Sequence, residues 1–485
     1  MTDRPHPLSP ADPVPPATLA AATDRFARRA DFAGTTVLVA GARVAGASAA
    51  RALLALGARV LVTDHGPASV ADALPPEAEF LGAVEHIPSG LDLVVTSPGL
   101  RPDNALLQQA YAAGLPVFGE LEFAWRLRGD QPAQWLVVTG TNGKTTTVRM
   151  LESILLASGR RALAVGNVGV PIIDAVMAEP GYDVLAVEAS SFQLHHSATI
   201  APRAGAILNL AADHLDWHGT MSAYAQEKTK VWAGAVAIAN AEDALVAELF
   251  AQVRSGPDGR PERWTFSAGG TSTGQFGVVD GRLVDPDGRT LAVAADIRPP
   301  GRHNVSNALA AAALAEAGGL GPADAAAGLA AFVPDPHRNQ FVAELGGIRF
   351  VDDSKATNPH AADASLADYA SVVWIAGGQL KDAPVDDLVA AHAGRLRAVV
   401  LLGQDRAVIA EALARHAPDV PVITVSRTDD KAMSDVVAAA TSLARAGDVV
   451  LLAPAAASLD MYGSYSARGR AFAAAVAEIG GVTDL

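Results

Sequence analysis

The sequence predicts an α/β protein of three domains, in which parallel sheets are flanked by helices. Short apolar runs of β type alternate along the 485 residues with alanine-rich segments of helical period, which is typical of doubly wound sheets. The chain exceeds the roughly 250 residues at which single cores stop growing, and 50% of its residues are hydrophobic, so several cores can form. We expect a disordered tail at residues 1–30 and domains at 31–119, 120–335 and 336–485. The first and third domains are expected to be Rossmann-like, and the central one of the phosphate-loop (P-loop) ATPase type.

Composition argues against several classes of function. The net charge is −15, whereas nucleic-acid phosphates are held mainly by lysine and arginine, so no nucleic-acid partner is expected. No cysteine occurs, which excludes disulfides, thiolate metal sites and cysteine nucleophiles. The proline-rich, polar start does not read as a secretion signal, and no apolar stretch of about twenty residues suggests a membrane span. We therefore expect a soluble cytoplasmic protein without a membrane span. We also expect it to be a monomer.

The first domain is expected to begin with a strand, a glycine turn and a helix. A strand at 36–40 leads into the turn Gly41–Gly46, and a second strand at 59–63 ends at Asp64, near the usual spacing for a carboxylate that binds ribose. Arg43 occupies the middle glycine position of this turn, where its side chain would crowd a pyrophosphate lying flat on the backbone. A nicotinamide cofactor is therefore disfavoured.

A further strand of the first domain, at 91–96, ends in a loop that contains Ser97 and Gly99. Open α/β sheets bind ligands at the carboxyl ends of their strands. From these residues alone, a pocket for a nucleotide or nucleotide sugar and a purely structural turn are equally good interpretations.

The central domain opens with a glycine loop between a β-type run and a helix, Gly140–Thr146. Such a loop turns backbone N–H groups and a helix N-terminus toward phosphate oxygens, while Lys144 supplies charge and the Thr145 hydroxyl can bind Mg²⁺. The pattern indicates a nucleoside triphosphate, although Val138 stands where a standard phosphate loop has glycine. The alternative is a strand-turn-helix corner with an incidental lysine.

Two later strands of the central domain also end in polar residues. The strand at 184–187 delivers Glu188, which could hold Mg²⁺ opposite the phosphates, although a solvated glutamate would be the better interpretation without the loop. The strand at 206–210 leads to His214, and Lys228 lies on the helix after it. For His214, a metal ligand and a hydrogen-bonded core histidine are equally open.

In the third domain, strands at 350–352, 372–376 and 449–452 all lead into polar loops. These loops are Asp353–Asn358, Gly377–Lys381 and Pro454–Asp460. Their cationic and hydroxyl side chains suit a small molecule that bears carboxylates. The alternative is ordinary helix capping, because Asp353 and Ser458 are both good N-cap residues.

Taken together, these motifs resemble the Mur ligase superfamily of three-domain, ATP-dependent enzymes that form amide bonds. The resemblance extends from about Val37 to Phe472 and rests on Gly140–Thr146, Glu188–Gln193, Asp213–Asp216, the spacing of Tyr224 and Lys228, and Gly301–Asn307. Asp353–Asn358 and Ser458–Asp460, followed by Arg468-Gly469, are similar to the members that add D-glutamate, and no Asp-Asn-Pro-Arg motif of other members occurs. The departures are Arg43, Tyr465 in place of phenylalanine, and a longer proline-rich start.

The resemblance implies a reaction, its cofactors and its partners. ATP and Mg²⁺ would serve to join D-glutamate to UDP-N-acetylmuramoyl-L-alanine through an acyl phosphate, in peptidoglycan precursor synthesis. Implied catalytic residues are Lys144, Glu188, His214 and Lys228, and implied metal ligands are Thr145, Glu188, His214 and a carbamylated Lys228. Implied ATP-binding residues are Gly140, Thr141, Asn142, Gly143, Lys144, Thr145, Thr146, Asn307, Arg338 and Asp353. The UDP-substrate would be bound by Val44, Ala45, Asp64, Ser97, Gly99, Asn167 and His214, and D-glutamate by Thr357, Lys381, Ser458 and Tyr465.

Two rival interpretations predict different sequences. A ligase like folylpolyglutamate synthase shares the phosphate loop and glutamate transfer but should lack the nucleotide unit of residues 37–100. A catalytically silent regulator that binds a UDP-sugar should have lost Lys144, Glu188 or Lys228, and all three are present.

Overall fold

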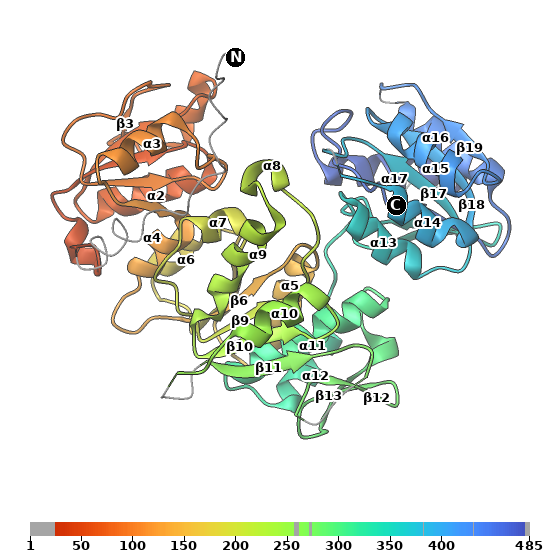
Figure 1. Cartoon of the computed structure of the whole chain (residues 1–485), viewed down its shortest axis with the longest axis horizontal. Helices are drawn as coiled ribbons and strands as arrows, with labels where there is room; N and C mark the ends of the chain where they lie inside the picture. The colour runs from red at the N-terminus through yellow and green to blue at the C-terminus, as the bar shows by residue number, and fades with distance from the viewer. Residues whose placement is uncertain (1–24, 257–260, 271–273, 382, 430, 481–485) are drawn as a thin grey trace, which may run out of the picture. The chain divides into compact units, whose positions relative to one another are not determined.

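The computed structural model describes residues 25–256, 261–270, 274–381, 383–429 and 431–480. Figure 1 shows strands and helices alternating along the chain, and the strands form three largely parallel sheets and a small antiparallel one. Contacts divide the chain into two compact units. The first contains the described residues up to 294 with 306–332, and the second contains 295–305 with the described residues from 333 onward.

The first sheet lies in the first unit and has the order β3-β2-β1-β4-β5, with all strands parallel. Its elements are η1 (Arg29–Phe32), β1 (Thr36–Ala40), α2 (Val44–Ala55), β2 (Arg59–Thr63), η2 (Ala68–Ala73), β3 (Glu79–Phe80), β4 (Leu93–Thr96), α3 (Ala105–Ala112) and β5 (Val117–Gly119). The strand order reverses between β1 and β4, so the loops after these two strands lie next to each other. This is the place where open α/β sheets bind ligands. The predicted strand at 91–96 begins two residues late because Asp92 instead accepts a hydrogen bond from the Thr36 N–H at 2.9 Å.

The folded part of the chain begins before residue 31, where the predicted disordered tail (residues 1–30) was expected to end. Residues 1–24 of that tail lie outside the described residues. Residues 25–30 are described: Phe26 is fully buried with its ring 5.3 Å from that of Phe32, and Arg29 donates to Val176 O at 3.0 Å. The packed chain therefore includes residues ahead of the expected boundary, since an aromatic side chain there completes a core.

The central sheet has the order β11-β10-β9-β6-β8-β7 and is also parallel. Its strands are β6 (Gln134–Thr139), β7 (Ala162–Gly166), β8 (Val184–Glu188), β9 (Ala204–Ile207), β10 (Val236–Asn240) and β11 (Glu262–Phe266). The helices around it are α5 (Lys144–Ala157), α6 (Ile172–Met177), α7 (Ser191–His195), α8 (Leu215–His218), α9 (Met221–Thr229), η3 (Lys230–Ala233), α10 (Ala244–Gln252), α11 (Arg302–Ala317) and α12 (Pro322–Ala331). The antiparallel sheet is formed by β12 (Gly277–Val279), β13 (Arg282–Val284) and β14 (Thr290–Val293), followed by η4 (Ala294–Asp296). β9 ends three residues before the predicted Leu210 because Asn209 bonds the phosphate loop instead of continuing the strand.

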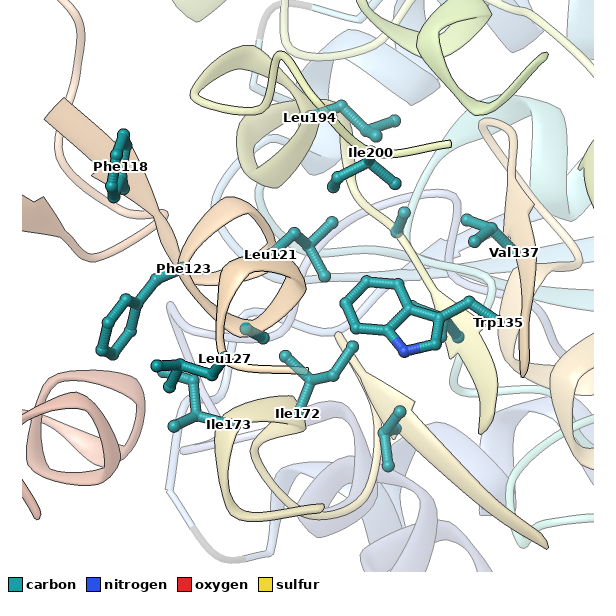
Figure 2. Packing of buried hydrophobic residues seen from close by; sticks show 14 of the residues in the cluster. Phe118, Leu121, Phe123, Leu127, Trp135, Val137, Ile172, Ile173, Leu194 and Ile200 are labelled. Atoms are coloured by element: carbon teal, nitrogen blue, oxygen red, sulfur yellow. The ribbon is translucent and has the colours of Figure 1, made fainter. Parts of the chain in front are cut away.

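The first two sheets share one hydrophobic core around α4 (Glu120–Arg126). Figure 2 shows Phe118 and Phe123 on one side of this helix and Leu121 facing toward Trp135 of the central sheet. Glu122 of α4 is fully buried and accepts hydrogen bonds from the backbone of Ala198 at 2.9 Å and Thr199 at 3.0 Å. Each of the three predicted domains contains one large sheet, so the three-domain division stays a prediction. The first two sheets share a hydrophobic core and belong to one compact unit.

The second unit contains the third sheet, with the order β15-β16-β20-β17-β18-β19. The strands are β15 (Gln340–Leu345), β16 (Ile348–Asp352), β17 (Val372–Gly377), β18 (Leu396–Leu402), β19 (Val422–Thr424) and β20 (Val449–Leu452), of which only β15 runs antiparallel among the strands described. The helices are α13 (Pro359–Ala367), α14 (Asp386–His392), η5 (Ala393–Arg395), α15 (Arg406–His416), α16 (Ala432–Leu443) and α17 (Tyr465–Gly480). Because β16, β20 and β17 are neighbours and parallel, the three predicted polar loops emerge at one edge of the sheet.

Within the described parts of the chain, no helix is long and apolar enough to cross a membrane.

Candidate nucleotide-binding and catalytic site

The phosphate loop joins β6 to α5. At two of its positions the backbone has a conformation that only glycine adopts easily. Gly140 and Gly143 have φ values of 152° and 82°. A Cβ atom on Gly143 would lie 2.4 Å from Asn307 Oδ1, so the loop packs directly on α11. The structure therefore brings Asn307 next to the loop, although it lies far along the chain from β6.

Two contacts hold the loop in shape from the side of β9 and α9. The N–H of Asn142 donates to Asn209 Oδ1 at 2.8 Å, and Asn209 Nδ2 donates to Asn142 O at 3.1 Å. Thr141 Oγ1 lies 3.0 Å from the Tyr224 hydroxyl. Sequence reasoning missed Asn209, for which the only signal was an amide residue directly after an apolar strand.

Lys144, at the start of α5, folds back over the loop. Its Nζ donates to Gly140 O at 2.9 Å and to Thr141 O at 2.8 Å. The ammonium group is therefore held at the concave side of the loop, where it can meet an anion that the loop N–H groups bind.

Glu188 lies at the end of β8, beside β6, and is 2% exposed. Its Oε1 accepts a hydrogen bond from Asn167 Nδ2 at 2.9 Å, while its Oε2 is buried without a hydrogen-bond partner among the described residues. A buried carboxylate oxygen in this state needs an explanation such as an ion. It fits the oxygen ligands that Mg²⁺ prefers, whereas the solvated strand-end interpretation does not fit a residue so deeply buried.

Lys228 of α9 is 1% exposed, and its Nζ donates to Gly140 O at 3.0 Å and lies 3.3 Å from Thr139 Oγ1. Burial, followed by the nearby charge of Lys144, holds the pKa of the Lys228 amine well below its ordinary value. This lysine is therefore a buried residue at the base of the loop, with a lowered amine pKa, rather than a solvated helix residue.

His214 precedes α8 in a left-handed conformation, with φ 54°. Its side chain is 37% exposed, its Nε2 lies 3.6 Å from Asp213 Oδ2, and its ring centroid is 4.7 Å from that of Phe192. This exposure does not fit a core histidine. No group of three or more His, Asp or Glu side chains in the described ranges could hold a metal by itself. A cation here would therefore need oxygen atoms from a substrate or a modified side chain as well.

The turn after β1 is fastened by Asp64. Its Oδ2 accepts from the Ala42 N–H and its Oδ1 from the Gly66 N–H, both at 2.7 Å. Burial acts to raise the pKa of Asp64, but these backbone hydrogen bonds outweigh it and hold the pKa below its ordinary value. Asp64 thus has a structural role in the turn whether or not it also meets a ribose.

The other predicted residues of the first sheet surround that turn. Ala45 and Ser97 line one small hollow together with Glu120. Ser97 Oγ is buried without a hydrogen-bond partner in the described residues, while Val44 is 71% exposed and Gly99 is exposed. Asn167, predicted for the same substrate, instead bonds Glu188 near the phosphate loop. The pocket and the purely structural interpretation of this turn therefore both remain predictions.

In the second unit, Asp353 follows β16 and is held by two donors. Its Oδ1 accepts from the Asn339 N–H at 3.2 Å, and its Oδ2 accepts from the Ser365 hydroxyl. Removal from water raises the pKa of Asp353 to about 6. Arg338 Nε lies 3.9 Å from Asp335 Oδ2. The capping interpretation fails for Asp353, because Asn358 caps α13 by accepting from the Ala361 N–H at 2.8 Å.

The predicted D-glutamate residues share one edge of the third sheet. Ser458 is 3% exposed, Thr357 and Tyr465 are partly exposed, and Lys381 is exposed. Ser458 also caps no helix, since the next described helix begins at Tyr465. The Tyr465 carbonyl accepts from the Ser354 hydroxyl at 2.8 Å, so a substrate contact to this backbone would have to use the N–H at the helix start.

Buried Arg468 ties these loops together. It is 1% exposed, and its guanidinium donates to Ser354 Oγ at 3.0 Å, Ser354 O at 2.9 Å and Ala456 O at 3.1 Å. One side chain on α17 thereby fixes the loops after β16 and β20. Sequence reasoning noted this arginine only as part of a motif.

Comparisons with known proteins find both similar sequences and a similar fold. The profile of the Mur ligase middle domain matches residues 138–315, and that of the Mur ligase glutamate ligase domain matches residues 337–456. A curated UDP-N-acetylmuramoylalanine–D-glutamate ligase from Streptomyces coelicolor is 50% identical over 469 residues, 93% of this chain and 99% of the relative. Its namesake from Thermobifida fusca is 52% identical over 468 residues, 93% of this chain and 100% of the relative. The crystal structure of UDP-N-acetylmuramate-alanine ligase MurC from Thermotoga maritima shares the fold, with a TM-score of 0.57 and 19% identity, over 92% of this chain and 100% of that one.

The low pKa of Lys228 predicts how its replacement changes stability with pH. In the unfolded chain this lysine keeps its proton up to the ordinary pKa of 10.5, whereas burial lowers that pKa in the folded chain. The unfolded state therefore binds more protons, and each unit of pKa depression costs about 1.4 kcal/mol of folding free energy at neutral pH. We expect Lys228→Met to be more stable than the parent at pH 7 in carbonate-free buffer, with an advantage that shrinks as the pH rises toward 10.5.

Urea unfolding of both proteins between pH 7 and 10 measures this difference. The exposed Lys431 provides a matched control, since Lys431→Met should show no such pH trend. An advantage of Lys228→Met that stayed constant with pH would contradict a depressed pKa.

Proposed function

This chain belongs to the Mur ligase family, and we propose that it catalyses the ATP-dependent addition of D-glutamate to UDP-N-acetylmuramoyl-L-alanine in peptidoglycan precursor synthesis. The observation that carries the chemistry is the phosphate loop with two buried residues beside it, a carboxylate with one oxygen unpaired among the described residues and a lysine with a lowered pKa. The near full-length similarity to ligases of that name supports the choice of substrates.

The reaction proceeds in two steps that need different help from the protein. First, an oxygen of the L-alanine carboxylate bonds to the γ-phosphorus of ATP while the bond to ADP breaks, which gives an acyl phosphate. Then the D-glutamate amine attacks the acyl carbon, and the tetrahedral intermediate expels phosphate and loses a proton. Two anions meet in the first step, so the Lys144 ammonium and the loop N–H groups must offset their repulsion.

The residues around the loop fit Mg²⁺. The Thr145 hydroxyl and Glu188 Oε2 are suited to one ion, and His214 with a modified Lys228 to another. When bound, Mg²⁺ neutralises charge that builds up on the phosphate oxygens. Lys144, Glu188, His214 and Lys228 are therefore the catalytic group of the proposal.

The environment of Lys228 favours its carbamylation. An uncharged amine has the free electron pair needed to bond the carbon of CO₂, and loss of one N–H proton then leaves an anionic carbamate. An ammonium has no electron pair for a cation. A carbamate instead supplies the oxygen ligands that Mg²⁺ prefers.

The remaining predicted residues complete the substrate sites of the proposal. ATP is bound by the loop Gly140–Thr146, with Asn307 toward the adenine, and by Arg338 and Asp353 on its phosphate and ribose side. D-glutamate carboxylates are held by Thr357, Lys381, Ser458 and the Tyr465 N–H. The UDP-substrate contacts Val44, Ala45, Asp64, Ser97 and Gly99, and its muramoyl-alanine end faces Asn167 and His214. The proposed enzyme acts as a monomer in the cytoplasm.

The two rivals are less well supported. The first sheet, β1 to β5, is present, whereas a ligase like folylpolyglutamate synthase was expected to lack it. Lys144, Glu188 and Lys228 form one group around the loop, which a silent regulator has no reason to keep.

The substrate assignment predicts that phosphate release from ATP requires UDP-N-acetylmuramoyl-L-alanine and D-glutamate together. L-glutamate should fail, because with both carboxylates held its amine no longer faces the acyl phosphate. A panel of D- and L-amino acids in a phosphate-release assay measures this. Equal turnover with L-lysine or meso-diaminopimelate would refute the assignment.

The loop assignment predicts a large loss of rate for Lys144→Ala. Removal of one electrostatic partner of the transition state commonly lowers the rate about 10²- to 10³-fold, and we expect at least that loss. The thermal midpoint should change little, because Lys144 caps a loop rather than filling the core. Lys431→Ala, on an exposed lysine far along the chain, should keep full activity. Near-normal turnover of Lys144→Ala would show that this loop does not bind the reacting phosphate.

The carbamate predicts chemical rescue at Lys228. Lys228→Ala should be nearly inactive, and acetate or formate should restore part of its rate by placing a carboxylate in the vacated space. Lys228→Arg should stay inactive with the same additives, since guanidinium can neither form this carbamate nor offer an electron pair. Titration of both variants, with mass spectrometry of the intact protein, provides the measurement. Full activity of Lys228→Ala without added carboxylate would rule the carbamate out.

A further inference from the structure

Asn339 is a buried, left-handed residue between the two proposed ATP residues of the second unit. It follows Arg338 directly in the chain, its φ is 47° and it is 7% exposed. Its backbone N–H donates to Asp353 Oδ1 at 3.2 Å. Asn339 therefore determines the direction of the backbone after Arg338, and it helps to orient the Asp353 carboxylate.

The side chain of Asn339 holds this backbone in place. Its Nδ2 donates to Asp368 Oδ2 at 3.1 Å, and its Oδ1 accepts from the Tyr369 hydroxyl at 2.6 Å. Both partners lie at the end of α13. An amide offers a donor and an acceptor at once, and asparagine tolerates positive φ better than most residues. Few other side chains could meet all three requirements.

The residue on the other side of Arg338 is held in a similar way. His337 has φ 65°, is 9% exposed, and its Nδ1 lies 2.6 Å from Asp352 Oδ2. Arg338 is thus flanked by two left-handed residues, each bonded to one of two consecutive aspartates. Backbone in sparsely populated regions persists only where its surroundings over-determine it, and it concentrates at ligand sites.

We infer that Asn339 is a positioning residue for ATP, whose side chain keeps Arg338 and Asp353 in the arrangement that receives the nucleotide. The inference rests on the proposed function, which assigns ATP to these two neighbours. Asn339 itself is buried among protein groups and acts through Arg338 and Asp353 rather than by touching the reacting atoms.

Asn339→Gly isolates the side chain, because glycine keeps the left-handed backbone and the N–H to Asp353. Both side-chain hydrogen bonds are lost, so we expect the Kd and the KM for ATP to rise about tenfold. The KM values for D-glutamate and the UDP-substrate, and kcat, should change less than about twofold. Isothermal titration calorimetry with ATP and steady-state kinetics provide the two readouts.

Two further variants keep the test decisive. Tyr369→Phe removes only the donor to Asn339 Oδ1 and should weaken ATP binding in the same direction by a smaller factor, even if the glycine variant folds poorly. Asp280→Gly is the matched control, since Asp280 has the same φ of 47° but lies exposed in the hairpin between β12 and β13. It should leave ATP affinity unchanged.

Unchanged ATP affinity in folded Asn339→Gly and Tyr369→Phe would overturn the inference. So would a lower thermal midpoint with an equal loss in all kinetic constants, which is the result expected of a merely structural residue. Because calorimetry measures ATP binding without turnover, a parent protein that binds ATP but transfers no D-glutamate would refute the proposed function and leave this inference standing.

Discussion

The candidate active site depends on one carbonyl oxygen, that of Gly140, which accepts hydrogen bonds from two lysines. Lys144 Nζ lies 2.9 Å and Lys228 Nζ 3.0 Å from it. Two ammonium groups so close together repel each other. Lys228 is the more deeply buried of the two, and burial, followed by the charge of Lys144, lowers the pKa of its amine. The shape of the loop, set by Gly140 and Gly143, thus also brings the two lysines together.

Strained backbone conformations are concentrated near the predicted site residues. Six non-glycine residues among those described have positive φ, and five of them lie at or near predicted site residues: His214, His337, Asn339, Lys381 and Ala455. The sixth, Asp280, is an ordinary hairpin residue. Each such conformation costs about 1–3 kcal/mol, so the surrounding contacts must hold it. Ala455, for example, is fully buried, and its neighbour Ala456 accepts a hydrogen bond from Arg468. The loops that follow the strands therefore contain both the polar side chains and the strained backbone that orients these side chains.

The sequence predicts well what depends on neighbouring residues in the chain. Apolar runs place β1, β2 and β20 at their observed bounds, and the glycine loop lies, as predicted, between a strand and a helix, β6 and α5. What the sequence could not predict depends on contacts between distant segments. The end of β9 was misplaced because Asn209 bonds the loop, and the tail boundary was misplaced because Phe26 fills a distant core. The bridging role of Asn339 was likewise invisible, since its partners lie about thirty residues further along the chain.

Buried charges of this protein fall into two groups that differ in how completely they are satisfied. Glu122 receives hydrogen bonds on both oxygens, from Thr199 and Arg126 on one and from two backbone N–H groups on the other, and it joins two sheets. Arg468 is equally well paired and joins the loops of the third sheet. Glu188 instead keeps one oxygen without a partner among the described residues, and burial lowers the pKa of the Lys228 amine. Desolvation is unfavourable for all four groups, but only fully paired ones regain that free energy from the fold itself. Glu122 and Arg468 regain that free energy from protein partners, whereas for the Glu188 oxygen a ligand such as the proposed cation would supply it.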